Sequence, residues 1–157
     1  MSSKIEQILS ILNEVALSLG DSFLQRLGPG KDAGNGATNQ FMAKVNTEVA
    51  SRVGHNLAER RICGETNFSV DFYVPEQATV IEVELSARNP HANLERDLFK
   101  TFLANRAGNK VRRLVLVGKP GTLKRFALPD LRAIAAWSKE NQDIQLEVVE
   151  IPRKAAA

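Results

Sequence analysis

The chain has 157 residues, of which 43% are hydrophobic and 25% charged, and its only cysteine is Cys63. A chain of this length buries about two-thirds of its unfolded surface, so we expect one domain (1–157) that folds without disulfides. A single cysteine favours the reducing cytoplasm, and no apolar run approaches the ~20 residues of a membrane span. The net charge of only +3 excludes strongly polyionic chains and leaves the partner open.

The N-terminal part of the chain predicts two helices separated by a loop. Apolar residues recur every three or four positions over 3–27, which is typical of an amphipathic helix that Gly20 can break. Segment 28–39 holds four glycines and no apolar residue larger than alanine, so we expect a loop. Its glycine spacing does not match that of a nucleotide phosphate-binding loop. Thr38 or Asn39 can cap a second helix. The apolar stripe of that helix comprises Phe41, Val45, Val49 and Val53.

After residue 59, predicted strands alternate with predicted helices. The strands are expected over 60–63, 67–74, 79–86, 111–117 and 144–151. The helices are expected over 92–105 and 128–140, with a basic loop at 118–125 and a tail at 152–157. This order predicts an α/β fold in which a mixed sheet carries helices on its faces.

Basic residues are concentrated between Leu85 and Arg125. This segment contains ten lysines and arginines against two acids, a balance of +8, whereas the remainder of the chain sums to −5. Such a segment is the usual electrostatic signature of a phosphate-rich partner. A solvated charged surface would give the same pattern.

Two of the predicted strands form a hairpin that carries three acids. If its loop is 75–78, the register places Asp71 directly across from Glu82, with β-carbons about 5 Å apart. Glu84 projects from the same face, and the opposite face is apolar. Neighbouring carboxylates of this kind need water, a cation or a raised pKa. A hard divalent cation such as Mg²⁺ suits carboxylate oxygens.

This hairpin resembles the signature of the PD-(D/E)XK, or restriction-endonuclease-like, nuclease superfamily. Members carry an Asp on one strand and Glu-x-Lys on the next, and Asp71 and Glu82-Val83-Glu84 align with these positions. Residues 40–117 also follow the superfamily's order of elements. Glu84 stands where the motif has lysine, so the resemblance assigns catalysis to Asp71, Glu82 and Glu84, with Glu84 orienting or deprotonating water.

The resemblance implies a restriction-endonuclease-like, three-layer α/β/α fold with a central mixed sheet. The nuclease-like core would cover 40–151, preceded by the added N-terminal helix 1–27 and the glycine-rich loop 28–39. The implied activity is metal-dependent hydrolysis of phosphodiester bonds in DNA, with Mg²⁺ or Mn²⁺ as cofactor.

The resemblance also implies a set of metal ligands. Asp71, Glu82 and the backbone carbonyl of Val83 would bind the ion, joined by a glutamate from the preceding helix. Glu48 is the first candidate for that glutamate and Glu59 the second.

We expect the DNA phosphate backbone to be bound by cations of the basic segment. Arg88, Arg96 or Lys100 could supply the positive charge of the missing lysine. Arg96 and Lys100, however, lie off the apolar stripe of their helix, which favours solvent-facing positions instead. The expected phosphate-binding residues are Arg88, Arg96, Lys100, Lys119, Lys124 and Arg125.

Two other functions are compatible with the same sequence. One is a non-catalytic nucleic-acid-binding or assembly protein that keeps the nuclease fold without turnover. The other is a small-molecule-binding α/β domain in which the hairpin acids are incidental. A chain this short leaves little room for a separate recognition domain, so a nuclease of this size is expected to form a homodimer or to use a targeting partner protein.

Overall fold

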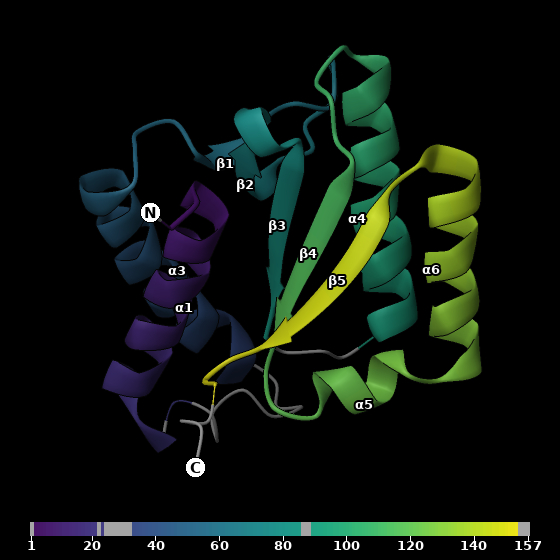
Figure 1. Ribbon diagram of the computed structural model, residues 1–157. Helices are drawn as coiled ribbons and strands as arrows, with labels where there is room; N and C mark the ends of the chain where they lie inside the picture. The colour runs from purple at the N-terminus through teal and green to yellow at the C-terminus, as the bar shows by residue number, and fades with distance from the viewer. Residues whose placement is uncertain (1, 22, 24–32, 86–88, 154–157) are drawn as a thin grey trace.

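A five-stranded mixed sheet lies between two layers of helices in the computed structural model, which describes residues 2–21, 23, 33–85 and 89–153 (Figure 1). The strands are Ala58–Arg60 (β1), Val70–Val74 (β2), Thr79–Glu84 (β3), Arg113–Gly118 (β4) and Gln145–Glu150 (β5). They lie in the order β1-β2-β3-β4-β5. The first three form an antiparallel meander, and β4 and β5 run parallel to β3. The predicted α/β class with a mixed sheet is confirmed.

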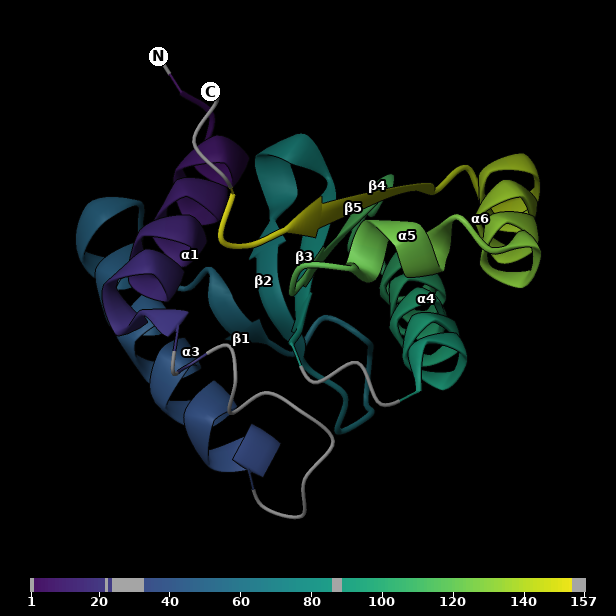
Figure 2. The same cartoon turned by 90° about the horizontal axis from the view of Figure 1, so that it is seen from below.

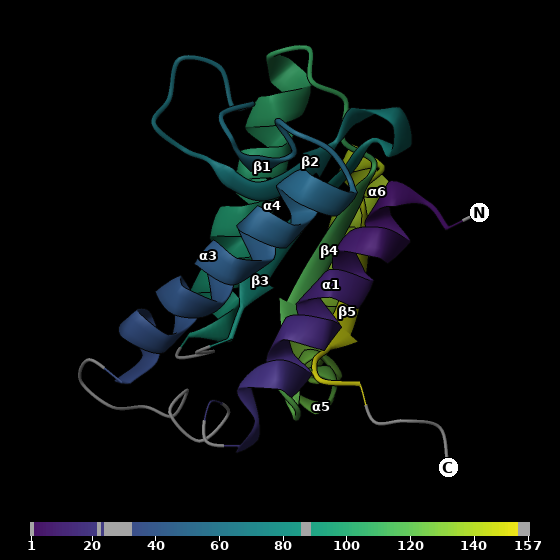
Figure 3. The ribbon, with the colours of Figure 1, turned by 90° about the vertical axis from the view of Figure 1, so that its left-hand side faces the viewer.

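Helices cover both faces of this sheet. Helices α1 (Lys4–Leu19) and α3 (Ala33–Arg52) lie side by side on one face, as Figure 3 shows. The other face carries α4 (Pro90–Arg106) and α6 (Pro129–Gln142), with the short α5 (Thr122–Phe126) at one end (Figure 2). Each helical layer packs on the sheet through its own cluster of buried apolar side chains.

The first helix ends where its sequence predicted a break. Ser3 and Glu6 form a capping box at its start, and Gly20 follows its last residue with φ +75°, a conformation that favours glycine. The apolar side of α1 packs against α3, where the rings of Phe23 and Phe41 stack with centroids 5.2 Å apart. This packing buries most of the described apolar residues of both predicted stripes, and residues 24–27 of the first lie outside the described part of the chain.

The predicted glycine-rich loop 28–39 is wrong from Ala33 onward, because α3 already begins there. Residues 28–32 lie outside the described part of the chain. Thr38 and Asn39 are inside the helix and do not cap it, and the buried Thr38 hydroxyl has no hydrogen-bond partner. Ala37, Phe41, Val45 and Val49 are buried, whereas Val53 is partly buried and follows the end of α3. Tertiary packing of this kind overrides the weak helix propensity of a glycine-rich turn.

Two strand predictions are shifted. The strand expected at 60–63 is Ala58–Arg60, because pairing with β2 aligns Ala58 with Phe72 and Arg60 with Val70. The strand expected from 67 begins only at Val70, and Phe68 before it is exposed. In both cases the boundary depends on pairing with another strand, and the sequence pattern of the strand itself does not reveal that pairing.

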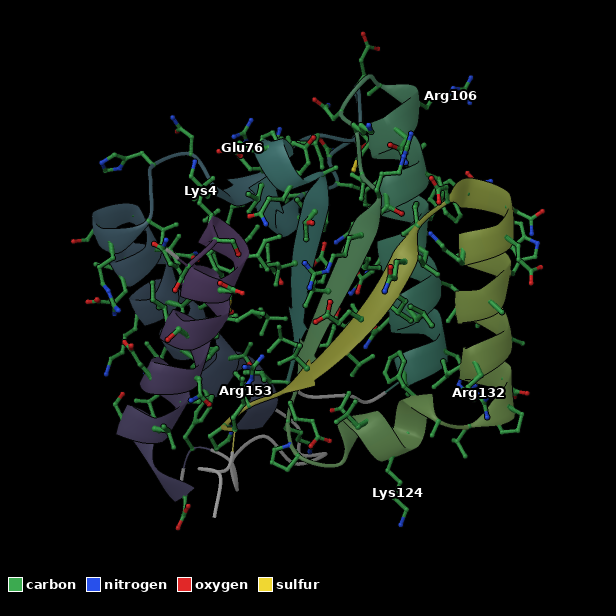
Figure 4. All side chains as sticks on the ribbon, viewed as in Figure 1. Lys4, Glu76, Arg106, Lys124, Arg132 and Arg153 are labelled. Carbon is green, nitrogen blue, oxygen red and sulfur yellow. The ribbon has the colours of Figure 1, made fainter. Side chains whose placement is uncertain are left out.

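The predicted hairpin register is confirmed. Strands β2 and β3 pair Phe72 with Ile81 and Val74 with Thr79. The connection consists of a 3₁₀ turn, Pro75–Gln77, and Ala78 with φ +47°. An ion pair between Lys4 and Glu76 joins this turn to the start of α1, and Figure 4 shows the two side chains at the same end of the molecule.

Candidate functional site

Asp71, Glu82 and Glu84 lie on the face of the sheet that α4 covers. The confirmed register places Asp71 across from Glu82. Asp71 Oδ2 also accepts a hydrogen bond from the backbone N–H of Val83 at 2.7 Å. The side chain of Val83 belongs to the apolar cluster on the opposite face. The predicted grouping of the three hairpin acids is therefore present.

Helix α4 adds a fourth acid and a lysine to this group. Asp97 is fully buried, and Lys100 is only 8% exposed. Lys100 Nζ lies 3.2 Å from Glu82 Oε1 and 3.6 Å from Asp97 Oδ1. The prediction that Lys100 faces solvent is wrong, because the sheet face opposite α4 is itself acidic at this point.

Asp97 is a site residue that the sequence analysis missed. It precedes Lys100 by three residues, so both side chains lie on one face of α4. It also directly precedes Leu98, which is buried in the second apolar cluster. An acid–base pair at this spacing, next to a buried stripe and after an acidic strand, is the sequence signal that could have identified it.

Arg96 covers the outer end of the group. Its Nη2 atom lies 2.9 Å from Glu84 Oε1, and its Nε atom lies 3.6 Å from Asp97 Oδ1. The Arg96 side chain is about half exposed, whereas that of Glu84 is 23% exposed. Glu84 and Arg96 are thus the members of the group closest to solvent.

We call Asp71, Glu82, Glu84 and Asp97 the acid cluster. Burial raises the pKa of all four carboxyl groups, that of Glu84 to about 8. Repulsion by neighbouring carboxylates adds to the raised pKa of Glu82 and of Glu84. Fully ionised, the four acids would exceed the two cations of α4 by two negative charges. The cluster therefore holds protons unless a further cation enters it.

Burial alone would lower the pKa of Lys100, but Glu82 and Asp97 outweigh it and raise that pKa. Lys100 is accordingly a charged ammonium group throughout the neutral range. It is the counter-ion in closest contact with the buried end of the acid cluster.

Carboxylate oxygens are the kind of donor that Mg²⁺ prefers. Among the described residues, no three His, Cys, Asp or Glu side chains are grouped so that they could hold a metal ion. A Mg²⁺ site commonly uses one or two carboxylates and completes its shell with water and phosphate oxygens. The adjoining carboxyl groups of Asp71 and Glu82 supply such a pair. The buried Asp97 lies nearby, with its Oδ1 atom 3.6 Å from both Arg96 Nε and Lys100 Nζ.

The predicted additional ligands are not part of the acid cluster. Glu48 lies 3.6 Å from Arg52 and lines a hollow between α1 and α3 together with Glu14. Because α3 covers the opposite face of the sheet, Glu48 cannot reach the hairpin acids, and its prediction as a ligand is wrong. Glu59 is exposed on β1, with φ +51°.

The short helix α5 replaces part of the predicted basic loop and carries two of its cations. Lys124 and Arg125 are exposed on this helix, and Lys119, at the end of β4, is half-buried. The Glu150 carboxylate accepts hydrogen bonds from the N–H groups of Gly121 (2.8 Å) and Leu123 (3.0 Å) and so fixes the start of α5. The end of β5 therefore positions the cations of α5.

A small, mostly apolar pocket lies between α4, α5 and the sheet. Leu94, Phe126 and Arg125 line it, and Glu84 and Asp97 are also among its lining residues. The other cations of the basic segment are dispersed: in Figure 4, Arg106 lies at the far end of α4 from Lys124. Arg88 lies outside the described residues. The +8 segment thus does not form a single surface patch.

In the described ranges no helix is both long and apolar enough to cross a membrane. Comparison of the chain with protein-family models, with curated proteins and with solved structures finds no match.

Proposed function

We propose that this protein is a metal-dependent nuclease with a restriction-endonuclease-like fold that hydrolyses phosphodiester bonds in DNA. The observation that carries the proposal is the acid cluster, in which a hairpin and a helix bring four carboxyl groups together with the two cations Arg96 and Lys100 of α4. Burying so many acids is costly unless the cluster has a counter-ion or a proton-transfer role.

Asp71, Glu82 and the backbone carbonyl of Val83 would hold Mg²⁺ or Mn²⁺. When bound, such an ion supplies a water of lowered pKa and stabilises negative charge on the phosphoryl oxygens. Glu84 is partly exposed, so its carboxyl group is the member of the cluster that water from solvent can reach. Once a bound divalent cation had displaced its proton, the Glu84 carboxylate would be the general base in place of a lysine.

Lys100 supplies the positive charge that the motif lysine would otherwise provide, from α4 instead of β3. Arg96 and Arg125 lie at the rim of the cluster, where guanidinium groups can bind the phosphate next to the scissile bond. Lys119 and Lys124 extend this contact along the backbone of the DNA. A homodimer would cut both DNA strands, whereas a targeting partner protein would select the cleavage site.

Plasmid nicking with isosteric variants tests the proposal. Supercoiled DNA is incubated with Mg²⁺ or Mn²⁺ and with the wild type, Asp71→Asn, Glu82→Gln or Glu95→Gln. Glu95 is an exposed glutamate on α4, so Glu95→Gln is the matched control for the loss of one carboxylate. We expect nicking by the wild type and the control, and at least a hundredfold loss in the two site variants. Equal nicking by all four proteins, or by none, contradicts the proposal.

One feature favours a second candidate, a nucleic-acid-binding protein that keeps this fold without turnover. Glu82 is only 3% exposed, so this acid of the proposed metal site has little access to solvent. Such a protein would bind DNA with an affinity that falls steeply with salt, and Asp71→Asn would leave that affinity unchanged. Binding of this kind without nicking identifies this candidate.

A further inference from the structure

Lys100 places its ammonium group inside the acid cluster, where a bound cation would be attracted. Its Nζ atom contacts Glu82 and Asp97, two acids from different elements, while its own side chain is only 10% exposed. The main chain of Lys100 is held separately, because its carbonyl oxygen accepts a hydrogen bond from the buried Cys63 thiol at 3.3 Å. The ammonium group is therefore a cation tethered to a fixed point of α4.

We propose that Lys100 is a built-in counter-ion that occupies the acid cluster in the metal-free protein and competes with the divalent cation for it. This inference rests on the metal site of the proposed function. A divalent ion at Asp71 and Glu82 would share the Glu82 carboxylate with the ammonium group, and two cations on one buried carboxylate repel each other strongly. Entry of the ion therefore requires the Lys100 ammonium to leave Glu82.

The residues around Lys100 indicate where its ammonium group would go when a divalent ion binds Glu82. Glu82 and Asp97 attract the ammonium group, and the neighbouring guanidinium of Arg96 repels it. Asp97 Oδ1 is already within 3.6 Å of Lys100 Nζ. When a divalent ion binds Glu82, the ammonium group can remain beside Asp97 without leaving the protein interior.

Binding of Mn²⁺ to the metal-free protein, without DNA, tests the competition. Calorimetric titration compares the wild type with Lys100→Met, which removes the charge but keeps an unbranched side chain, and with Lys100→Arg, which keeps the charge. We expect Lys100→Met to bind Mn²⁺ about tenfold more tightly than the wild type, and Lys100→Arg to bind it like the wild type. Lys110→Met, at an exposed lysine, controls for the change in net charge and should bind like the wild type.

Equal or weaker Mn²⁺ binding by Lys100→Met overturns the inference. So does an absence of Mn²⁺ binding in every protein, which also removes the metal from the proposed function. Nicking by the wild type together with equal affinities would refute the counter-ion role alone. Tighter binding by Lys100→Met in a protein that never nicks DNA would refute the nuclease alone.

A second measurement uses the wild type and does not depend on the stability of a variant. The ammonium groups of buried lysines exchange slowly enough to be followed by nitrogen-15 NMR. We expect the Lys100 ammonium signal to shift in a saturable manner as Mg²⁺ is added, while that of Lys110 stays in place. A Lys100 signal that does not move while Mg²⁺ saturates the site overturns the competition.

Discussion

The raised pKa of Glu84 predicts that stability falls as pH rises from about 5 to 8 in the absence of divalent cations. In the folded chain this pKa is about 8, against an ordinary value of 4.5. Between these values the folded state keeps a proton that the unfolded state has released. Deprotonation at higher pH therefore favours unfolding, and the loss levels off above pH 8.

The size of the effect follows from the difference of about 3.5 pH units. At 1.36 kcal/mol per unit, an isolated group would lose about 5 kcal/mol of unfolding free energy across the window. This is an upper limit, because the Glu84 side chain is 23% exposed and Asp97 and Arg96 respond to its charge. Acids whose pKa is lowered, such as Glu14 and Glu76, change the stability only at pH values below this window. They therefore do not offset the loss of stability between pH 5 and 8.

Urea unfolding at pH 5, 6, 7 and 8, followed by circular dichroism in EDTA, measures the slope. Glu84→Gln keeps the shape of the side chain and cannot ionise, so we expect its stability to fall less steeply, by up to about 1.4 kcal/mol per pH unit. The exposed Glu95→Gln should retain the wild-type slope. A wild-type stability that rises through the window, or identical slopes for the wild type and Glu84→Gln, would refute the reasoning.

Three further predictions concern packing. The buried thiol of Cys63, whose pKa burial raises, should react with Ellman's reagent only after unfolding; immediate reaction of one equivalent in the native state contradicts this. Gly118→Ala should cost about 1–3 kcal/mol in urea unfolding, because the new β-carbon would lie 2.7 Å from Thr122 Cγ2; adding Thr122→Gly should recover part of the loss. Phe41→Ala should cost about 3–5 kcal/mol, whereas Leu17→Ala at an exposed position should cost little; equal losses contradict the assignment of the core.

The hairpin could be predicted in detail because its information is local. Strict alternation, a four-residue turn with Pro75 at its start, and an apolar face opposite the acids together fix the pairing of Asp71 with Glu82. The boundaries of β1 and α3 could not be predicted in the same way. Pairing partners and helix–helix packing, which are distant in sequence, determine both.

The site residues on α4 could not be predicted from the sequence for a different reason. The hydrophobic pattern of a helix shows which side packs on apolar surface, and by that rule Asp97 and Lys100 face water. The sheet beneath α4 is acidic at Glu82 and Glu84, so the buried side of the helix includes polar residues there. Burial of a lysine can be predicted only once its buried partner is known.

Leu94 and Leu98 seat α4 on the sheet, and the same contact removes the acid cluster from water. The packing of α4 on the hairpin therefore contributes both to the apolar core and to the raised pKa of the four carboxyl groups. We expect that shortening Leu94 or Leu98 would let water reach the acid cluster. The pKa values of its carboxyl groups would then fall, although none of these acids had been substituted. In this protein, substitution of an apolar core residue would therefore change the charge of the acid cluster.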